Sequence, residues 1–127
     1  MRTALLLLPL LFVAACGRSP VCHLPMIPTP GMFLDASAWL AAHPGDALTA
    51  CLDDRCATVN QTSPAQLQLP AGTDSSKPLH LTVTDASGLH ASRDFAPVLH
   101  TIDNGCGEFH WYETPGTLTA AGRLQPG

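Results

Sequence analysis

The sequence predicts an all-β protein, an antiparallel β-sandwich of about seven short strands with one short helix. Two observations predict this fold class. After residue 46, short apolar runs recur about every 8–12 residues with turn-forming residues between them, as in β-sandwiches. A chain of 127 residues, with twelve prolines and ten glycines, is also long enough for one domain but not for two independent cores.

The strands are expected where apolar and polar residues alternate between turn signals, because successive side chains of a strand point to opposite faces. These segments are 47–52, 55–60, 66–69, 79–85, 89–95, 98–102, 109–112 and 117–124.

The turn at 85–88 can be tested for register. A three-residue loop keeps the apolar residues of both flanking strands on one face. It predicts four cross-strand pairs: Leu79 with Phe95, His80 with Asp94, Val83 with Ala91, and Thr84 with His90. Arg93 is then the one charged residue on the otherwise apolar inner face.

The helix is expected at 35–42. Asp35 or Ser37 can cap its first turn, and a Pro-Gly pair stops it. Trp39 and Leu40 are expected to pack the helix onto the body.

The N-terminus has the features of an export signal. Residues 1–15 contain a basic start at Arg2 and an apolar run over residues 4–13. A ten-residue helix spans roughly 15 Å, half of the ~30 Å hydrocarbon core, and Pro9 interrupts it. The segment is therefore expected to direct export rather than to span the membrane.

Small residues precede Cys16 in the sequence Val-Ala-Ala-Cys, which is similar to a bacterial lipobox. In this motif the cysteine receives a diacylglycerol thioether and becomes the first residue of the mature chain. An ordinary signal peptide with a cysteine beside the cleavage site is the alternative. Lipidation predicts a membrane partner for Cys16, a proline-rich tether over residues 16–31, and a sandwich domain over residues 32–127.

The charge composition excludes one class of partner. The formal net charge is −4 and the chain has one lysine, so there is no basic stripe to neutralise phosphates. Nucleic-acid binding is not expected.

Four further cysteines suggest two disulfides in an oxidising compartment, with three connectivities open. A hairpin that turns at 53–54 places Cys51 opposite Cys56, where side chains approach closely. Cys22 and Cys106 remain for a bridge between the tether and the late strands. A four-cysteine metal site is the alternative, but the paired C-x₂-C spacing of zinc sites is absent.

Histidines raise a second metal hypothesis, a copper- or zinc-binding protein. His80, His90, His100 and His110 recur every ten residues, but this is also the spacing of one strand and one turn. The segment 22–32 adds soft ligands, among them Met32, that suit Cu(I). Surface histidines are the first interpretation, and no cofactor is expected.

No catalytic motif stands out, so an enzyme is not expected. The sequence Gly-x-Ser-x-Gly is absent, and no serine has a base close to it in sequence. A pair of carboxylates, as in glycosidases, is the alternative. Glu108 and Glu113 are the only glutamates, and they occur among turn residues.

The densest aromatic segment is 109–112. Burial of Phe109 and Trp111 in the core is the first interpretation. The alternative is an exposed partner patch of His110, Trp111 and Tyr112 for a protein or surface ligand.

The chain resembles small lipoproteins of high-GC Gram-positive bacteria in five segments. These are the lipobox, LDASAWLAAHPG (34–45), ACLDDRC (50–56), LTVTDASG (81–88) and NGC (104–106). The resemblance implies an immunoglobulin-like sandwich and carries no catalytic motif. We therefore expect a membrane-anchored, extracytoplasmic binding or envelope-surface protein without catalytic activity.

Overall fold

The computed structural model describes residues 21–26, 29–60 and 64–127. These residues are mostly β, as the sequence predicts, with half of the chain in strands and one short helix. The elements are β1 (Gly31–Asp35), α1 (Ser37–Ala42), β2 (Leu48–Leu52), β3 (Arg55–Val59), β4 (Ala65–Gln68), β5 (Leu79–Thr84), β6 (His90–Phe95), β7 (Val98–Asp103), β8 (Glu108–Leu118) and β9 (Leu124–Pro126).

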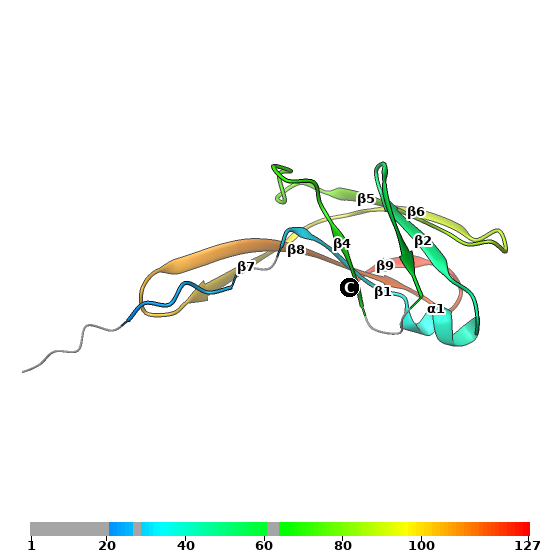
Figure 1. Cartoon of the computed structure of the whole chain (residues 1–127), viewed down its shortest axis with the longest axis horizontal. Helices are drawn as coiled ribbons and strands as arrows, with labels where there is room; N and C mark the ends of the chain where they lie inside the picture. The colour runs from blue at the N-terminus through cyan, green and yellow to red at the C-terminus, as the bar shows by residue number, and fades with distance from the viewer. Residues whose placement is uncertain (1–20, 27–28, 61–63) are drawn as a thin grey trace, which may run out of the picture.

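The strands form two sheets that pack as a sandwich (Figure 1). The five-stranded sheet has the order β4-β1-β8-β7, and β9 also pairs with β8. The four-stranded sheet has the order β3-β2-β5-β6. All strand pairs are antiparallel except β1 with β8, which is parallel.

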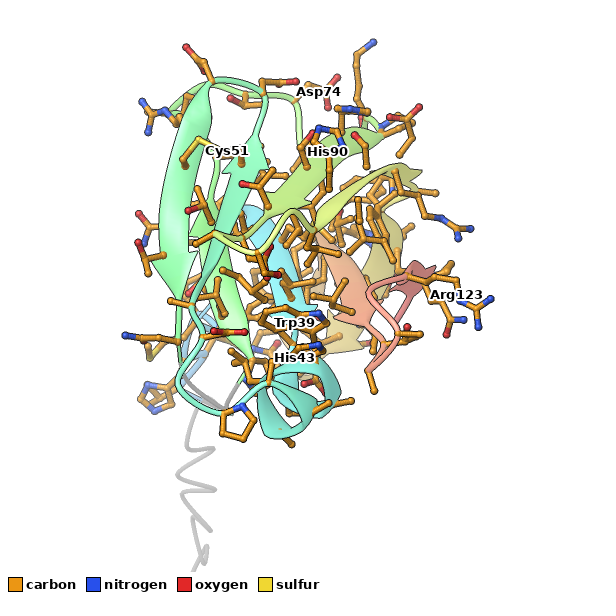
Figure 2. The ribbon with its side chains drawn as sticks, turned by 90° about the vertical axis from the view of Figure 1, so that its right-hand side faces the viewer. Trp39, His43, Cys51, Asp74, His90 and Arg123 are labelled. Carbon is orange, nitrogen blue, oxygen red and sulfur yellow. A yellow bond between two sulfur atoms is a disulfide. The ribbon has the colours of Figure 1, made fainter. Side chains whose placement is uncertain are left out.

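The core lies between the inner faces of the two sheets, where alternate residues of each strand are buried. The five-stranded sheet contributes Met32, Leu34, Leu67, Leu118 and Leu124, and the four-stranded sheet contributes Leu48, Ala50, Leu52, Val59, Leu79, Leu81, Val83 and Phe95. The helix adds Trp39, which is 2% exposed and stacks on His43 (Figure 2). The N-cap residue of the helix is Ala36, which has no capping side chain, so the expected cap at Asp35 or Ser37 is wrong; Asp35, one residue earlier, accepts a hydrogen bond from Ser37 N–H on its Oδ1 at 2.9 Å.

The hairpin of β5 and β6 has the predicted register. All four predicted pairs occur, and the loop closes with Asp85 N–H donating to the Leu89 carbonyl at 3.3 Å. Arg93 lies opposite Leu81, as expected of the one charged residue on the inner face. Because β6 is an edge strand, the Arg93 guanidinium reaches past the sheet and donates to the Leu124 carbonyl at 3.1 Å. This contact joins the edges of the two sheets.

Strand β1 was not predicted from the sequence. It lies between β4 and β8 in the five-stranded sheet, and its Met32 and Leu34 side chains are fully buried. Its five residues follow a run of prolines, and that run suggested extended chain up to residue 31. Its partners are more than thirty residues away along the chain, so no local turn reveals the strand.

The expected strand at 117–124 is wrong. Residues 117 and 118 end β8, a turn follows, and Leu124 begins β9. The turn is closed by Thr119 N–H, which donates to the Arg123 carbonyl at 2.9 Å. The two segments expected at 109–112 and 117–124 are joined in part, since β8 runs without a break through Pro115, whose carbonyl accepts a hydrogen bond from Gly127 N–H at 3.1 Å.

The hairpin of β7 with residues 108–113 of β8 extends beyond the second sheet (Figure 1). We call this two-stranded extension the arm. The described N-terminal segment, residues 21–26, lies along it in Figure 1.

Candidate functional site

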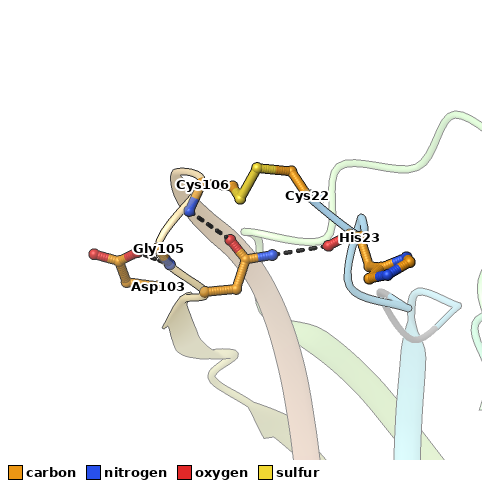
Figure 3. Close-up of a disulfide and its surroundings, with 6 residues drawn as sticks. Cys22, His23, Asp103, Gly105 and Cys106 are labelled. Atoms are coloured by element: carbon orange, nitrogen blue, oxygen red, sulfur yellow. Dashed lines mark hydrogen bonds between the residues drawn. A yellow bond between two sulfur atoms is a disulfide. The ribbon is translucent and has the colours of Figure 1, made fainter. Parts of the chain in front are cut away.

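The tip of the arm is tied to the N-terminal segment. Cys22 and Cys106 form a disulfide with a Cα–Cα distance of 5.7 Å, which confirms the second predicted pairing. Asn104 Nδ2 donates to the His23 carbonyl at 2.8 Å, and Asn104 Oδ1 accepts from Cys106 N–H at 3.1 Å (Figure 3). The chain that leads back to Cys16 therefore leaves the domain at the arm tip. Cys16 itself, with the expected lipidation, lies outside the described residues.

The second disulfide is confined to one hairpin. Cys51 on β2 lies opposite Cys56 on β3, and their Cα atoms are 4.0 Å apart. The predicted turn at 53–54 is confirmed, and Asp53 has a φ of 51°. The bridge lies on the four-stranded sheet, away from the arm.

The exposed apolar residues of the described chain are concentrated in one region. They all belong to the arm or to the segment tied to its tip: Val98 (46% exposed), Leu99 (51%), Ile102 (41%), Val21, Leu24 and Met26. Exposed apolar groups that cluster in this way mark interaction sites more often than scattered ones do.

The arm carries these residues on two faces. The even-numbered residues of β8 continue the inner face, because Thr114, Gly116 and Leu118 are buried in the core. The odd-numbered residues therefore lie on the outer face of the five-stranded sheet, together with their partners on β7 and β1. We call this outer surface the apolar face after its apolar residues Phe33, Val98, Ile102, Phe109, Trp111 and Pro115; the same face also carries the polar side chains of Asp35, Gln66, His100, Glu113 and Thr117.

Trp111 is held in place at the centre of the arm. Its ring stacks on His100 at 5.4 Å between centroids, and its Nε1–H donates to Glu113 Oε1 at 3.2 Å. His100 Nε2 lies 3.2 Å from Glu113 Oε2. Trp111 and Phe109 are half-buried and lie outside the core, so the core interpretation of these two residues is wrong.

The predicted patch of His110, Trp111 and Tyr112 is divided by strand alternation. Trp111 lies on the apolar face, whereas His110 and Tyr112 lie on the opposite face of the arm. There, Thr101 Oγ1 and His110 Nδ1 are hydrogen-bonded at 2.9 Å. The three residues therefore do not form one surface.

The outer face of the four-stranded sheet has the opposite character. We call it the polar face; its residues include Thr49, Thr58, His80, Thr82, Thr84, His90, Ser92 and Asp94. A solvated outer face of this composition is usual for a sandwich. The apolar face is the unusual one of the two.

One cluster on the polar face has the connectivity of a catalytic triad, which was not predicted from the sequence. Ser92 Oγ lies 2.8 Å from His80 Nε2, and His80 Nδ1 lies 2.5 Å from Asp94 Oδ1. The His80–Asp94 pairing was predicted, but Ser92 joins it only through its place opposite Thr82. The side chains of His80 and Asp94 are 52% and 75% exposed, so water competes for both groups. A hollow of about 500 Å³ at the β6 edge includes Ser92 in its lining but neither His80 nor Asp94.

The residues of the metal hypothesis lie apart. His80 and His90 lie on the polar face, while His100 and His110 lie on opposite faces of the arm. Met32 is buried in the core, and Cys22 is in a disulfide. Within the described ranges, no three His, Cys, Asp or Glu side chains gather as metal ligands would.

No family model matches this chain, and no match is found among curated proteins or solved structures. In the part of the chain that the structure describes, no helix has the length and apolar character needed to cross a bilayer.

Proposed function

We propose that this protein is an extracytoplasmic lipoprotein, anchored through a lipid on Cys16, with an immunoglobulin-like sandwich that binds a partner without catalysis. The observation that carries the proposal is the tie between the chain after Cys16 and the arm. The disulfide of Cys22 with Cys106 fixes the exit of the chain at the arm tip, next to the exposed apolar residues. A lipid on Cys16 would hold this end of the domain close to the membrane.

Three further features support the proposal. Residues 1–16 have the pattern of a lipoprotein signal. Both disulfides are of the kind that persists in an oxidising compartment. The two-layer arrangement of the strands agrees with an immunoglobulin-like sandwich, and the resemblance to small lipoproteins of high-GC Gram-positive bacteria agrees with an envelope protein.

The apolar face is the proposed binding surface. It combines a fixed tryptophan with the exposed side chains of Val98 and Ile102 on β7, and tryptophan is the residue most enriched in binding hot spots. The triad-like cluster is proposed to be a surface hydrogen-bond network. Its three side chains lie on an open sheet face, where no enclosed pocket would exclude water from a reacting group.

The anchor is tested by expressing the full chain in a bacterium that has the lipoprotein pathway. The membrane-extracted protein should begin at Cys16, should carry a mass increment of diacylglycerol with or without a further acyl chain, and should partition into detergent. Cys16→Ala should abolish the mass increment and the membrane retention. A wild-type protein recovered without an acyl group would overturn the proposed anchor.

A further inference from the structure

We infer that the apolar face rests on the lipid bilayer, so that the domain lies against the membrane with its polar face turned outward. The inference rests on the proposed lipidation of Cys16 and adds the orientation of the domain and the partner of the apolar face. The bilayer is favoured by the position at which the chain enters the domain, by the composition of the face, and by the charge of the arm.

The position of entry limits the distance of the arm from the membrane. Cys22 lies six residues after Cys16, and six residues span at most about 20 Å even when fully extended. Because Cys22 is bonded to Cys106, the arm tip cannot move farther than this from the lipid anchor. The apolar face begins beside that tip, at Ile102 and Phe109, and continues along β8 to Pro115.

The composition of the face suits the membrane interface. Trp111 has an apolar ring and a polar Nε1–H, a combination that favours the boundary between headgroups and acyl chains. Val98, Ile102 and Phe109 lie near it on the same face, together with His100 and Glu113, which contact the Trp111 ring and its Nε1–H. Val21, Leu24 and Met26, at least 77% exposed each, lie on the segment tied to the arm tip. A short anchor also keeps the face at a high effective concentration near the lipid, so a weak contact becomes populated.

The charge of the arm indicates how the contact is made. The arm has Asp103, Glu108 and Glu113 and neither lysine nor arginine. A basic surface would bind anionic lipid by charge, and its binding would weaken in salt. Here the contact depends on apolar burial and the arm is acidic, so added salt should not weaken it.

The test uses the lipidated full chain, reconstituted in vesicles of phosphatidylcholine and phosphatidylglycerol whose acyl chains carry bromine as a fluorescence quencher. The chain has two tryptophans, and Trp39 is enclosed in the core. We expect the emission of Trp111 to shift to shorter wavelength and to be quenched, and the quenching should be no weaker at high salt than at low salt. In Trp111→Phe, the remaining emission of Trp39 should be unquenched.

Two variants of β7 make a matched pair. Ile102→Asp and Leu99→Asp each replace a half-exposed aliphatic residue by a carboxylate, but on opposite faces of the arm. Ile102→Asp should lower the population of the bilayer-bound state about tenfold, because a buried aliphatic side chain is lost from the contact. Leu99→Asp should leave the quenching of Trp111 unchanged. Both positions are exposed, so the fold should persist, and intact disulfides in the mass spectrum verify it.

Three results would overturn the inference. The first is an acylated protein whose Trp111 is unquenched, which leaves the proposed anchor intact. The second is an equal loss of quenching in both aspartate variants. This result would show that the arm inserts its tip into the bilayer with both faces in contact with lipid, rather than resting on one face. The third is a dimer in sedimentation that Ile102→Asp dissociates, because the face would then bind a second copy. A protein without the acyl mass would instead refute the proposed function.

Discussion

Met32 on β1 fills the space in front of Gly116 on β8, where any other residue would place a side chain. A β carbon on Gly116 would lie 2.3 Å from Met32 Cε and 3.0 Å from Phe95 Cε1. Phe95 belongs to the opposite sheet, so the glycine lets the two sheets pack together at this point. The end of the sandwich that supports the arm depends on this close packing.

Gly116→Ala should therefore destabilise the sandwich by overpacking. We expect its free energy of unfolding to fall by about 1–3 kcal/mol in urea denaturation. Met32→Val shortens the opposing side chain. It should therefore lower the free energy of unfolding less in the Gly116→Ala background than in the wild type. Additive effects of the two substitutions would contradict this packing.

The turn of the β2–β3 hairpin requires a left-handed backbone at Asp53, whose φ is 51°. Aspartate tolerates this conformation, whereas a β-branched residue does not. Asp53→Val should lower the free energy of unfolding by about 1–2 kcal/mol, while Asp53→Gly should change it by less than about 0.5 kcal/mol. Asp54→Val is the matched control, since its φ is negative, and it should cost less than Asp53→Val in the same denaturation experiment.

Asp85 makes stability depend on pH. Hydrogen bonds from the Ser87 hydroxyl and from backbone N–H groups, including that of Leu89, hold its pKa below the ordinary value of 3.8. A lowered pKa in the folded state stabilises the fold above pH 3.8, and this contribution is lost as the pH falls through the folded value. Asp85→Asn should thus differ most from the wild type at neutral pH and least well below pH 3.8. The check is urea denaturation over this range, and a difference independent of pH would contradict the assignment.

The sequence predicted the parts of the fold that local pattern determines. The two tight hairpins, at 53–54 and 85–88, have the expected registers because turn and alternation lie within a few residues of each other. It failed for β1 and for the long β8, because their pairing joins Met32 to Thr114 across the length of the chain. The prolines that precede β1 also favoured an extended tether rather than a strand.

The candidate site was predicted only in part for the same reason. The Cys22–Cys106 bridge followed from the cysteine count and the tight hairpin. The position of Trp111 on an outer face could not be predicted, because alternation within 109–112 allows either face to be buried. Only the long-range pairing of β8 with β1 determines which face meets the core. The Ser92 contact with His80 likewise needed the folded hairpin.

The triad-like cluster provides a fourth prediction. On an exposed sheet face, the Ser92 hydroxyl lacks the enclosed, preorganised donors that stabilise an oxyanion, so it should react no faster than an ordinary serine. A fluorophosphonate probe should leave Ser92 unmodified in tryptic peptide mass spectra. Labelling that is lost in both Ser92→Ala and His80→Ala would show an activated nucleophile and would contradict the proposed non-catalytic role.

The disulfide at the arm tip should act locally rather than on the whole sandwich. Its cysteines are 84 residues apart, and a loop of that length corresponds to about 4.5 kcal/mol in the chain-entropy estimate. That estimate assumes an otherwise unchanged native state. Here the N-terminal segment and the arm tip lie outside the core and would gain freedom in the native state too. Cys22→Ser with Cys106→Ser should therefore cost less than half of that free energy of unfolding.

The same double variant should make amide hydrogen exchange faster around Asp103 and Glu108, the last pair before the arm tip, because a two-stranded hairpin is only marginally stable alone. Cys51→Ser with Cys56→Ser is the control, and it should leave exchange in the arm unchanged. Equal acceleration throughout both sheets would contradict a local role. Without the tip disulfide and the neighbouring Asn104 hydrogen bond to His23, the chain would first be held at Thr29, seven residues beyond Cys22, which adds about 25 Å of reach. An intact disulfide therefore shortens the distance between the proposed anchor and the arm.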